Sequence, residues 1–173
     1  MGRPKAVVEI DGATMAGHVV GALSDLGAVP VFLVGGDPGW AADLGVDAVA
    51  DGWPGEGPLA ATATALAAAA EVDPDALVVV AACDQPWLTG SALGALVAAL
   101  AGAPGGQVAI ARTPDGRRHP FPSVWRAGTA DLVAHLVEGG ARRADAAMGH
   151  VAVVDVATDP AVVADVDRPE DLG

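Results

Sequence analysis

The most restrictive feature of the sequence is an apolar run that ends in an acidic loop. Residues 76–82 read Ala-Leu-Val-Val-Val-Ala-Ala, and residues 83–86 continue with Cys-Asp-Gln-Pro. A short apolar run that a turn ends is typical of a strand covered on both faces. Ligands bind outside the carboxyl ends of strands in open α/β sheets, so Asp84 is a candidate ligand for a divalent metal that also holds phosphates. The alternative is that Asp84 only caps the turn before Thr89.

Short apolar runs of this kind alternate with segments of helical periodicity along the chain. We expect strands at residues 7–10, 30–34, 47–50, 76–82, 108–111 and 151–156. We expect helices at residues 40–44, 59–70, 128–138 and 141–148, one that Thr14 caps and that runs to about residue 26, and another that ends near residue 100 and is capped by Thr89 or Ser91. Strands that are apolar on both faces and alternate with helices predict an α/β fold with a mostly parallel sheet and helices on both faces.

Length and charge narrow the class of protein further. The 173 residues fit one domain, residues 1–173. A net charge of −13 opposes binding to nucleic acid and to anionic membranes, so an anionic ligand must meet a local cluster of cations. No apolar stretch is long enough to span a membrane. One cysteine and no basic-then-apolar leader favour a reducing cytoplasm.

The only lysine of the chain, Lys5, stands in the segment Met-Gly-Arg-Pro-Lys at the front. A lysine ammonium group is a point charge that binds phosphate and stabilises charge that develops on a phosphate oxygen during transfer. Its alternative role is that of a solvated surface residue. Cys83 is interpreted as a small buried spacer, because no histidine lies near it in the sequence.

Two further segments carry candidate ligand-binding residues. Residues 55–59, Gly-Glu-Gly-Pro-Leu, open a helix whose backbone donors can hold a base or a phosphate, and Asp51 stands just before them. An ordinary turn is the other interpretation. Asp167 precedes a Pro-Glu-Asp segment near the C-terminus, where it can cap a helix or act as a second metal ligand.

Positive charge is clustered at two places in this acidic chain. Arg117-Arg118 precede His119, and Arg142-Arg143 follow two glycines. Such clusters are natural docks for a second anionic substrate, although they are also common as solvated surface.

Taken in order, six motifs resemble the molybdenum cofactor guanylyltransferase family: Met-Gly-x-x-Lys, Gly-Pro-Leu, Cys-Asp-x-Pro, His-Pro, Gly-x-Arg-Arg and Asp-x-Pro-Glu-Asp-Leu. The resemblance runs from Met1 to Leu172. It implies a Rossmann-like α/β domain in which a terminal phosphate of molybdenum-molybdopterin attacks the α-phosphate of Mg²⁺-bound GTP. Pyrophosphate leaves, and the guanine dinucleotide cofactor is formed. The resemblance also implies contacts with molybdoenzymes or other proteins of cofactor biosynthesis.

The resemblance assigns a role to each candidate residue. Lys5 and Asp84 are the expected catalytic residues, with Lys5 at the phosphates and Asp84 on Mg²⁺ together with Asp167. Asp51, Gly57 and Pro58 are expected at the guanine and ribose. His119, Arg142 and Arg143 are expected to bind the acceptor. The family often has Asn at the position of Asp167, and a carboxylate there still binds a metal.

The family also places a first strand and a Leu-Ala-Gly-Gly turn before the Met-Gly-x-x-Lys segment. Because this sequence starts inside that motif, we expect a longer natural product, and a gap or a pair of exposed strand edges in the 173-residue form. Two alternatives remain open. Gln85 resembles the cytidylyl branch, which leaves a cytidylyl or sugar-phosphate nucleotidyltransferase of the same fold, and the missing phosphate loop leaves a non-catalytic nucleotide-binding module.

Overall fold

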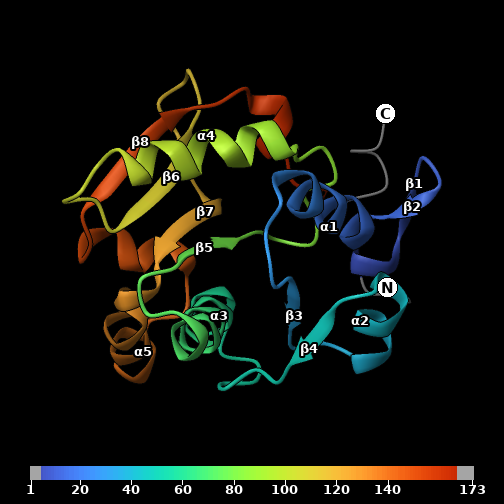
Figure 1. The fold of residues 1–173 in the computed structure, drawn as a ribbon, viewed down its shortest axis with the longest axis horizontal. Coiled ribbons are helices and arrows are strands. Elements are labelled where there is room, and N and C mark those ends of the chain that lie inside the picture. The colour runs from blue at the N-terminus through green and yellow to red at the C-terminus, as the bar shows by residue number, and fades with distance from the viewer. Residues whose placement is uncertain (1–4, 167–173) are drawn as a thin grey trace.

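The computed structural model describes residues 5–166. They form three layers, in which a four-stranded sheet lies between two layers of helices (Figure 1). The strand order is β5-β7-β6-β8, with β5 at Leu77–Val80, β7 at Arg118–Arg126, β6 at Val108–Arg112 and β8 at Val153–Ala157. One face is covered by α3 (Pro58–Val72) and α5 (Ala130–Glu138), and the other by α1 (Met15–Leu26) and α4 (Gly90–Ala101).

Smaller elements surround this core. A separate parallel pair consists of β3 (Phe32–Val34) and β4 (Asp47–Val49), with α2 (Pro38–Leu44) between them in sequence. A hairpin of β1 (Glu9–Ile10) and β2 (Ala13–Thr14) leads into α1. Four 3-10 helices complete the described chain: η1 (Lys5–Val7), η2 (Ala127–Thr129), η3 (Ala144–Gly149) and η4 (Pro160–Val163).

Helix starts follow the sequence closely, because capping is a local interaction. The Thr14 hydroxyl accepts a hydrogen bond from the Gly17 amide at 3.0 Å, and the Thr89 hydroxyl accepts one from the Ala92 amide at 3.2 Å. The cap of α4 is therefore Thr89 rather than Ser91. Each cap satisfies one of the amides that the first turn leaves unpaired.

The core sits on both faces of the central strands. Val108 and Ile110 of β6 pack towards α3 and α5, whereas Ala109 between them packs towards α4. All three are fully buried. Burying a Val or Ile side chain contributes roughly 1.5–3 kcal/mol, so the two-sided packing of β6 stabilises both helical layers.

The predicted α/β class, with helices on both faces, is confirmed. The sheet is mixed: β5, β6 and β8 run in one direction, and β7 runs antiparallel to β5 and β6. No strand was predicted at β7, because Pro120 and Pro122 argue against one. The pairing of β6 shifts from Ser123 to His119 between Ile110 and Ala111, so both prolines fall in the unpaired stretch.

The helix expected at residues 141–148 is wrong in type. A 3-10 helix occupies Ala144–Gly149 instead, after a turn in which Gly140 has φ +95°. The Arg142 carbonyl accepts a hydrogen bond from the Leu59 amide of α3, at 3.2 Å. That carbonyl is therefore not available to the amide four residues further on, which would be its partner in an α-helix.

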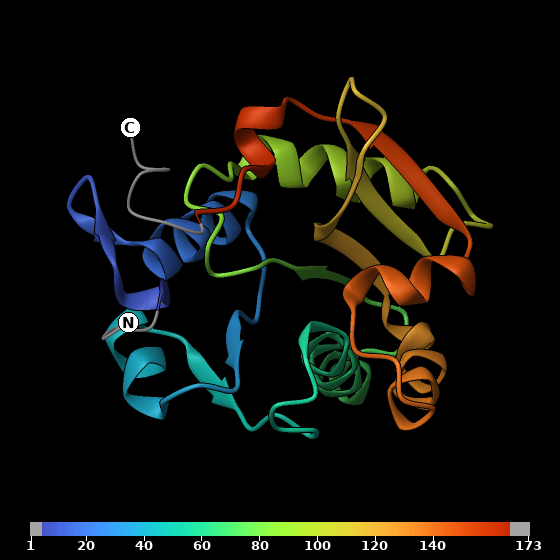
Figure 2. The same cartoon turned by 180° about the vertical axis from the view of Figure 1, so that it is seen from behind.

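The expected gap in the sheet is present. Among the described residues, β3 pairs only with β4, and β5 pairs only with β7. Figures 1 and 2 both show the β3-β4 pair standing apart from β5. A largely apolar cavity of about 950 Å³ lies between them, walled by residues of β3 and β5 and by α1 and α3. Two strand edges thus face one apolar space.

No helix within residues 5–166 has the length and apolar character needed to cross a bilayer.

A form of the protein that carries one additional apolar strand before Met1 should be more stable than the 173-residue chain. The strand would pair both edges and bury side chains worth roughly 1.5–3 kcal/mol each. We expect a thermal midpoint at least about 5 °C higher by circular dichroism. A Gly/Ser extension of equal length is the control, since it cannot fill an apolar cavity. Equal midpoints for the two extensions would contradict the prediction.

Candidate active site

Strand direction brings the polar loops to one edge of the sheet. The chain leaves β5 towards Asp84, and it leaves β6 into the turn of residues 113–117, which leads into β7. Because β5, β6 and β8 are parallel and β7 starts where they end, these loops and the segment after β8 share the carboxyl edge. This is the edge at which open α/β sheets bind ligands.

The loop after β5 is fixed by a buried amide. Gln85 is 1% exposed, and its Nε2 donates to the carbonyls of Phe121 at 3.0 Å and Val163 at 3.3 Å. The Asp84 carbonyl accepts from the Val166 amide at 2.9 Å. The strand end, β7 and the segment after η4 are therefore tied together at the loop that contains Asp84.

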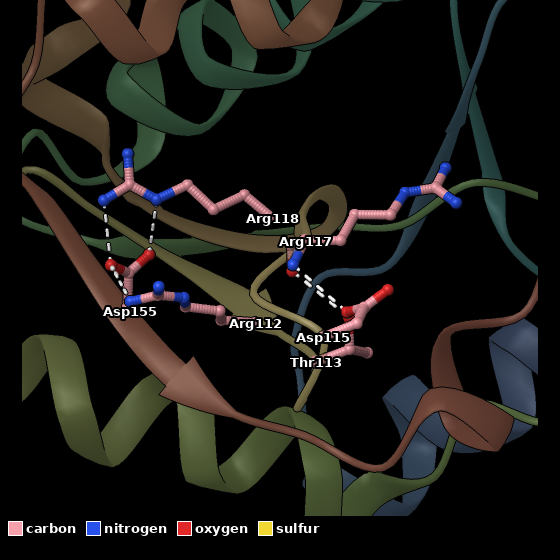
Figure 3. A network of polar contacts seen from close by, with 6 residues as sticks. All are labelled: Arg112, Thr113, Asp115, Arg117, Arg118 and Asp155. Atoms are coloured by element: carbon pink, nitrogen blue, oxygen red, sulfur yellow. Dashed lines mark hydrogen bonds and ion pairs between the residues drawn. The ribbon is translucent and has the colours of Figure 1, made fainter.

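The turn between β6 and β7 is held by its own polar groups (Figure 3). The Thr113 hydroxyl donates to Asp115 Oδ1 at 2.6 Å, and the Arg117 amide donates to the same oxygen at 3.1 Å. These bonds favour the carboxylate, and they lower the pKa of Asp115, with the Thr113 hydroxyl as the main cause. The turn therefore presents the start of β7 in a defined orientation.

Arg117, the last residue of the turn, and Arg118, the first residue of β7, point in opposite directions (Figure 3). Arg118 Nε and Nη2 donate to the two carboxylate oxygens of Asp155, at 2.7 and 2.8 Å. Arg112 lies opposite Arg118 in the register and reaches the same carboxylate at 3.7 Å. Asp155 thus joins three strands and pairs with two arginines, so Arg118 has a structural role.

Arg117 and His119 line one small pocket of about 220 Å³. Asp115 and Asp165 belong to the same lining. Partial burial is the first cause that lowers the pKa of His119, and the Arg117 charge is the second, so the imidazole is neutral at pH 7. Sequence reasoning placed Arg117 and Arg118 in one positive cluster and assigned only His119 beside them to the acceptor. Nothing in the sequence pattern separated Arg117 from Arg118.

Gly57 lies directly against Arg142. A Cβ on Gly57 would lie 2.9 Å from the Arg142 carbonyl oxygen, and Gly57 has φ +92°. The Arg142 guanidinium pairs with Glu56, on the same loop. The Leu59 amide donates to the Arg142 carbonyl, so this donor of the helix start is paired within the protein.

Arg143 is separate from Arg142 in its contacts. It forms a two-point pair with Asp145, at 2.9 and 2.7 Å, and its side chain is 83% exposed. Asp51 lies at the end of the strand pair, where its Oδ1 accepts from the Trp53 amide at 3.0 Å and from the Thr64 hydroxyl at 3.3 Å. Asp51 thus ties the chain after β4 to α3.

The remaining residues that the sequence singled out are Cys83, Lys5 and Asp167. Burial is the main cause that raises the pKa of Cys83, and the Asp84 charge is the second, which keeps the thiol protonated and agrees with a packing role. Lys5 begins η1. Asp167 lies outside the described residues, next to Val166.

The described residues offer oxygen ligands of the kind that Mg²⁺ prefers. Asp84 is one, and the bond from the Val166 amide brings the segment that contains Asp165 to the same place. Between residues 5 and 166 no group of three His, Cys, Asp or Glu side chains forms a preformed metal cluster. One or two carboxylates completed by substrate phosphates are the usual protein site for Mg²⁺, so the donor set fits this ion.

Comparison with known proteins identifies the family of the chain. The family model for the MobA-like NTP transferase domain matches residues 1–154. A curated protein of Mycobacterium tuberculosis, named probable molybdenum cofactor guanylyltransferase, is 35% identical over 148 residues, which are 84% of this chain and 71% of that protein. The molybdenum cofactor guanylyltransferase of Rhodobacter capsulatus is 32% identical, over 99% of this chain and 86% of its own length.

Solved structures share the fold. Molybdopterin-guanine dinucleotide biosynthesis protein A from Archaeoglobus fulgidus has a TM-score of 0.75 at 20% identity, with 99% of this chain and 88% of that chain covered. A Mycobacterium tuberculosis protein solved in complex with manganese has a TM-score of 0.71 at 22% identity, with 98% and 90% covered. The fold, the site and the matches together define a nucleotidyltransferase. The chain belongs to the family of MobA-like NTP transferase domains.

Replacing Gly57 by alanine should destabilise the protein more than replacing Gly55. Both glycines have positive φ, +92° and +81°, but a Cβ at Gly55 meets nothing within 4 Å. Gly55→Ala therefore measures the backbone cost alone, roughly 1 kcal/mol. Gly57→Ala adds the clash with the Arg142 carbonyl, and we expect a total of about 2–3 kcal/mol in urea unfolding. Equal losses for the two variants would argue against close packing of the loop on Arg142.

Proposed function

We propose that the protein transfers GMP from GTP to the terminal phosphate of molybdenum-molybdopterin. An oxygen of that phosphate attacks the α-phosphorus of GTP and forms a new phosphoanhydride bond. The bond from the α-phosphorus to the oxygen bridging to the β-phosphate breaks, and pyrophosphate leaves with the electron pair. Support comes from the curated relatives of this name and from the order of the candidate residues along the sheet edge.

That order is the observation that carries the proposal. Asp51 follows β4, Asp84 follows β5, and Arg117 and His119 lie where the turn after β6 enters β7, the neighbour of β5. The β3-β4 pair lies beside β5, because one cavity is walled by both. A nucleotide bound near Asp51 and an anionic acceptor bound near His119 would therefore lie on opposite sides of Asp84 and would meet there. Holding two reactants in this way converts a bimolecular step into an effectively unimolecular one.

The residues would divide the work by position. Asp51, Gly57 and Pro58 would face the guanosine, and Lys5 would contact the phosphates. Arg117, added here to His119 and Arg143, would attract the phosphate of the acceptor into a chain whose net charge of −13 otherwise repels it. The neutral His119 can accept or donate a hydrogen bond at the acceptor without adding charge.

Asp84 would hold the metal, with Asp167 as the expected second ligand. Mg²⁺ bound there would neutralise charge that develops on the phosphate oxygens during transfer. The solved manganese complex of a structural neighbour supports a divalent ion in this fold.

The structure weakens the one residue cue for a cytidylyl enzyme. Gln85 is buried and donates both of its described hydrogen bonds to main-chain carbonyls, so its amide holds the fold together and does not reach a base. Product formation with Mg·GTP and with Mg·CTP, in the presence of molybdenum-molybdopterin, tests base choice directly. Turnover with neither nucleotide would favour the non-catalytic binding module.

Asp84→Ala should abolish nucleotidyl transfer and leave the fold intact. The carboxylate lies at a strand end and contributes little to the core, whereas its metal contact offsets charge in the transition state. Turnover and circular dichroism would be compared with the unchanged protein. Activity above about a tenth of the original, a loss of less than roughly 1.4 kcal/mol, would exclude Asp84 as the metal ligand.

Arg117→Ala should raise the KM for the acceptor and leave the KM for Mg·GTP unchanged. We expect an increase of about tenfold, as for loss of one charge-assisted hydrogen bond. Arg118→Ala is the matched control, because it removes the neighbouring charge from the opposite face of the strand. It should lower the thermal midpoint through Asp155 without changing either KM. The same change in acceptor KM for both variants would contradict the assignment.

A further inference from the structure

Arg142 uses most of its side chain within the protein. Its Nε pairs with the Glu56 carboxylate, and its Nη1 donates to the carbonyls of Val137 at 2.8 Å and Ala141 at 3.0 Å. Val137 belongs to the last turn of α5, and Glu56 belongs to the loop before α3. The guanidinium therefore joins the end of one helix to the start of another. Few of its donors remain for an anionic ligand.

The backbone of Arg142 completes the same junction. Helix α3 begins after Gly57, which has no side chain to cap it, and its first residue, Pro58, has no amide hydrogen. The Ala60 amide donates to the Gly57 carbonyl at 3.1 Å, and the Leu59 amide donates to the Arg142 carbonyl at 3.2 Å. The Arg142 carbonyl thus takes the part that a capping side chain plays in other helices.

We infer that Arg142 is a positioning residue, which holds the loop of residues 55–58 for the nucleotide, and not a ligand of the acceptor. The inference rests on the proposed function, in which this loop faces the guanosine. Glu56 is the ion-pair partner through which Arg142 holds this loop. Gly57 lacks a side chain and so allows the loop to lie against the backbone of Arg142. A loop that is fixed before the nucleotide arrives has less entropy to lose on binding.

If Arg142 is a positioning residue, the effects of removing Arg142 and of removing Glu56 should be coupled. An acceptor-binding role for Arg142 predicts no such coupling. If Arg142 acts through Glu56, removing either side chain releases the same loop, and removing both does little more. If Arg142 binds the acceptor, Glu56 has no part in that contact. Glu56→Gln also leaves the contacts of Arg142 with α5 in place, so it separates loop release from damage to α5.

The first measurement is hydrogen exchange of the backbone amides within residues 56–60, all except Pro58, in the nucleotide-free full chain. Arg142→Ala and Glu56→Gln should each speed exchange about fivefold, which corresponds to about 1 kcal/mol. The double variant should match the faster single variant, and Arg142→Lys should lie between Arg142→Ala and the unchanged protein. Arg118→Ala is the control, since it breaks an arginine–carboxylate pair elsewhere, and it should leave these amides unchanged. Additive effects, or no effect of Glu56→Gln, would overturn the inference.

The second measurement is equilibrium binding of Mg·GTP to the same variants. Arg142→Ala and Glu56→Gln should weaken it by similar factors of about fivefold, with the acceptor KM unchanged. An unchanged protein that binds no Mg·GTP would overturn the proposed function, while the exchange measurement would still decide whether Arg142 positions the loop. Weaker acceptor binding alone, with normal exchange at residues 56–60, would return Arg142 to the acceptor dock.

Discussion

The pairing of β7 with both β5 and β6 is the interaction on which the arrangement of the site depends. Because β7 runs against its two neighbours, it begins at the edge where they end. The chain therefore returns to the carboxyl edge after β6 and brings Arg117 and His119 beside the loop that carries Asp84. The Gln85 amide, bonded to the Phe121 carbonyl, fixes the loop to the strand. Without β7, the two halves of the site would have no common support.

The site is also divided by chemistry. Its β7 side carries the cation Arg117 and a neutral imidazole, while its α3 side is shaped by backbone geometry at Gly57 and by paired charges at Glu56 and Arg142. An acceptor that is recognised by charge suits the first side. A nucleoside that is recognised by shape and hydrogen bonds suits the second. Asp84 lies between the two, at the end of β5.

How much the sequence could predict depended on the range of the interaction. The caps at Thr14 and Thr89 involve residues three positions away, and the sequence indicated Thr14 and left Thr89 and Ser91 as alternatives. The α/β class could be predicted because each apolar run indicates a strand by itself, without knowledge of its neighbours. Strand β7 was missed because its prolines contradict a strand, and only the register shift against β6 explains how they are accommodated.

Contacts between distant segments were beyond the reach of sequence patterns. Nothing near Arg142 in the sequence indicates that its carbonyl pairs with the Leu59 amide, or that its guanidinium meets Glu56. The two arginine pairs looked alike as charge clusters. Only the fold shows that Arg118 pairs with Asp155 while Arg117 lines a pocket. The resemblance supplied the roles of Lys5, Asp51, Asp84 and Asp167, which remain predictions.

The space between β3 and β5 has a consequence for the behaviour of many copies in solution. A strand edge with open backbone groups accepts any extended chain that reaches it, and here two such edges border an apolar space. A neighbouring molecule that frays would be a ready source of such a chain. The acidic surface opposes this encounter, because copies that each carry a charge of −13 repel one another at low ionic strength. Salt screens that repulsion, so the protein is best protected from self-association in dilute buffer.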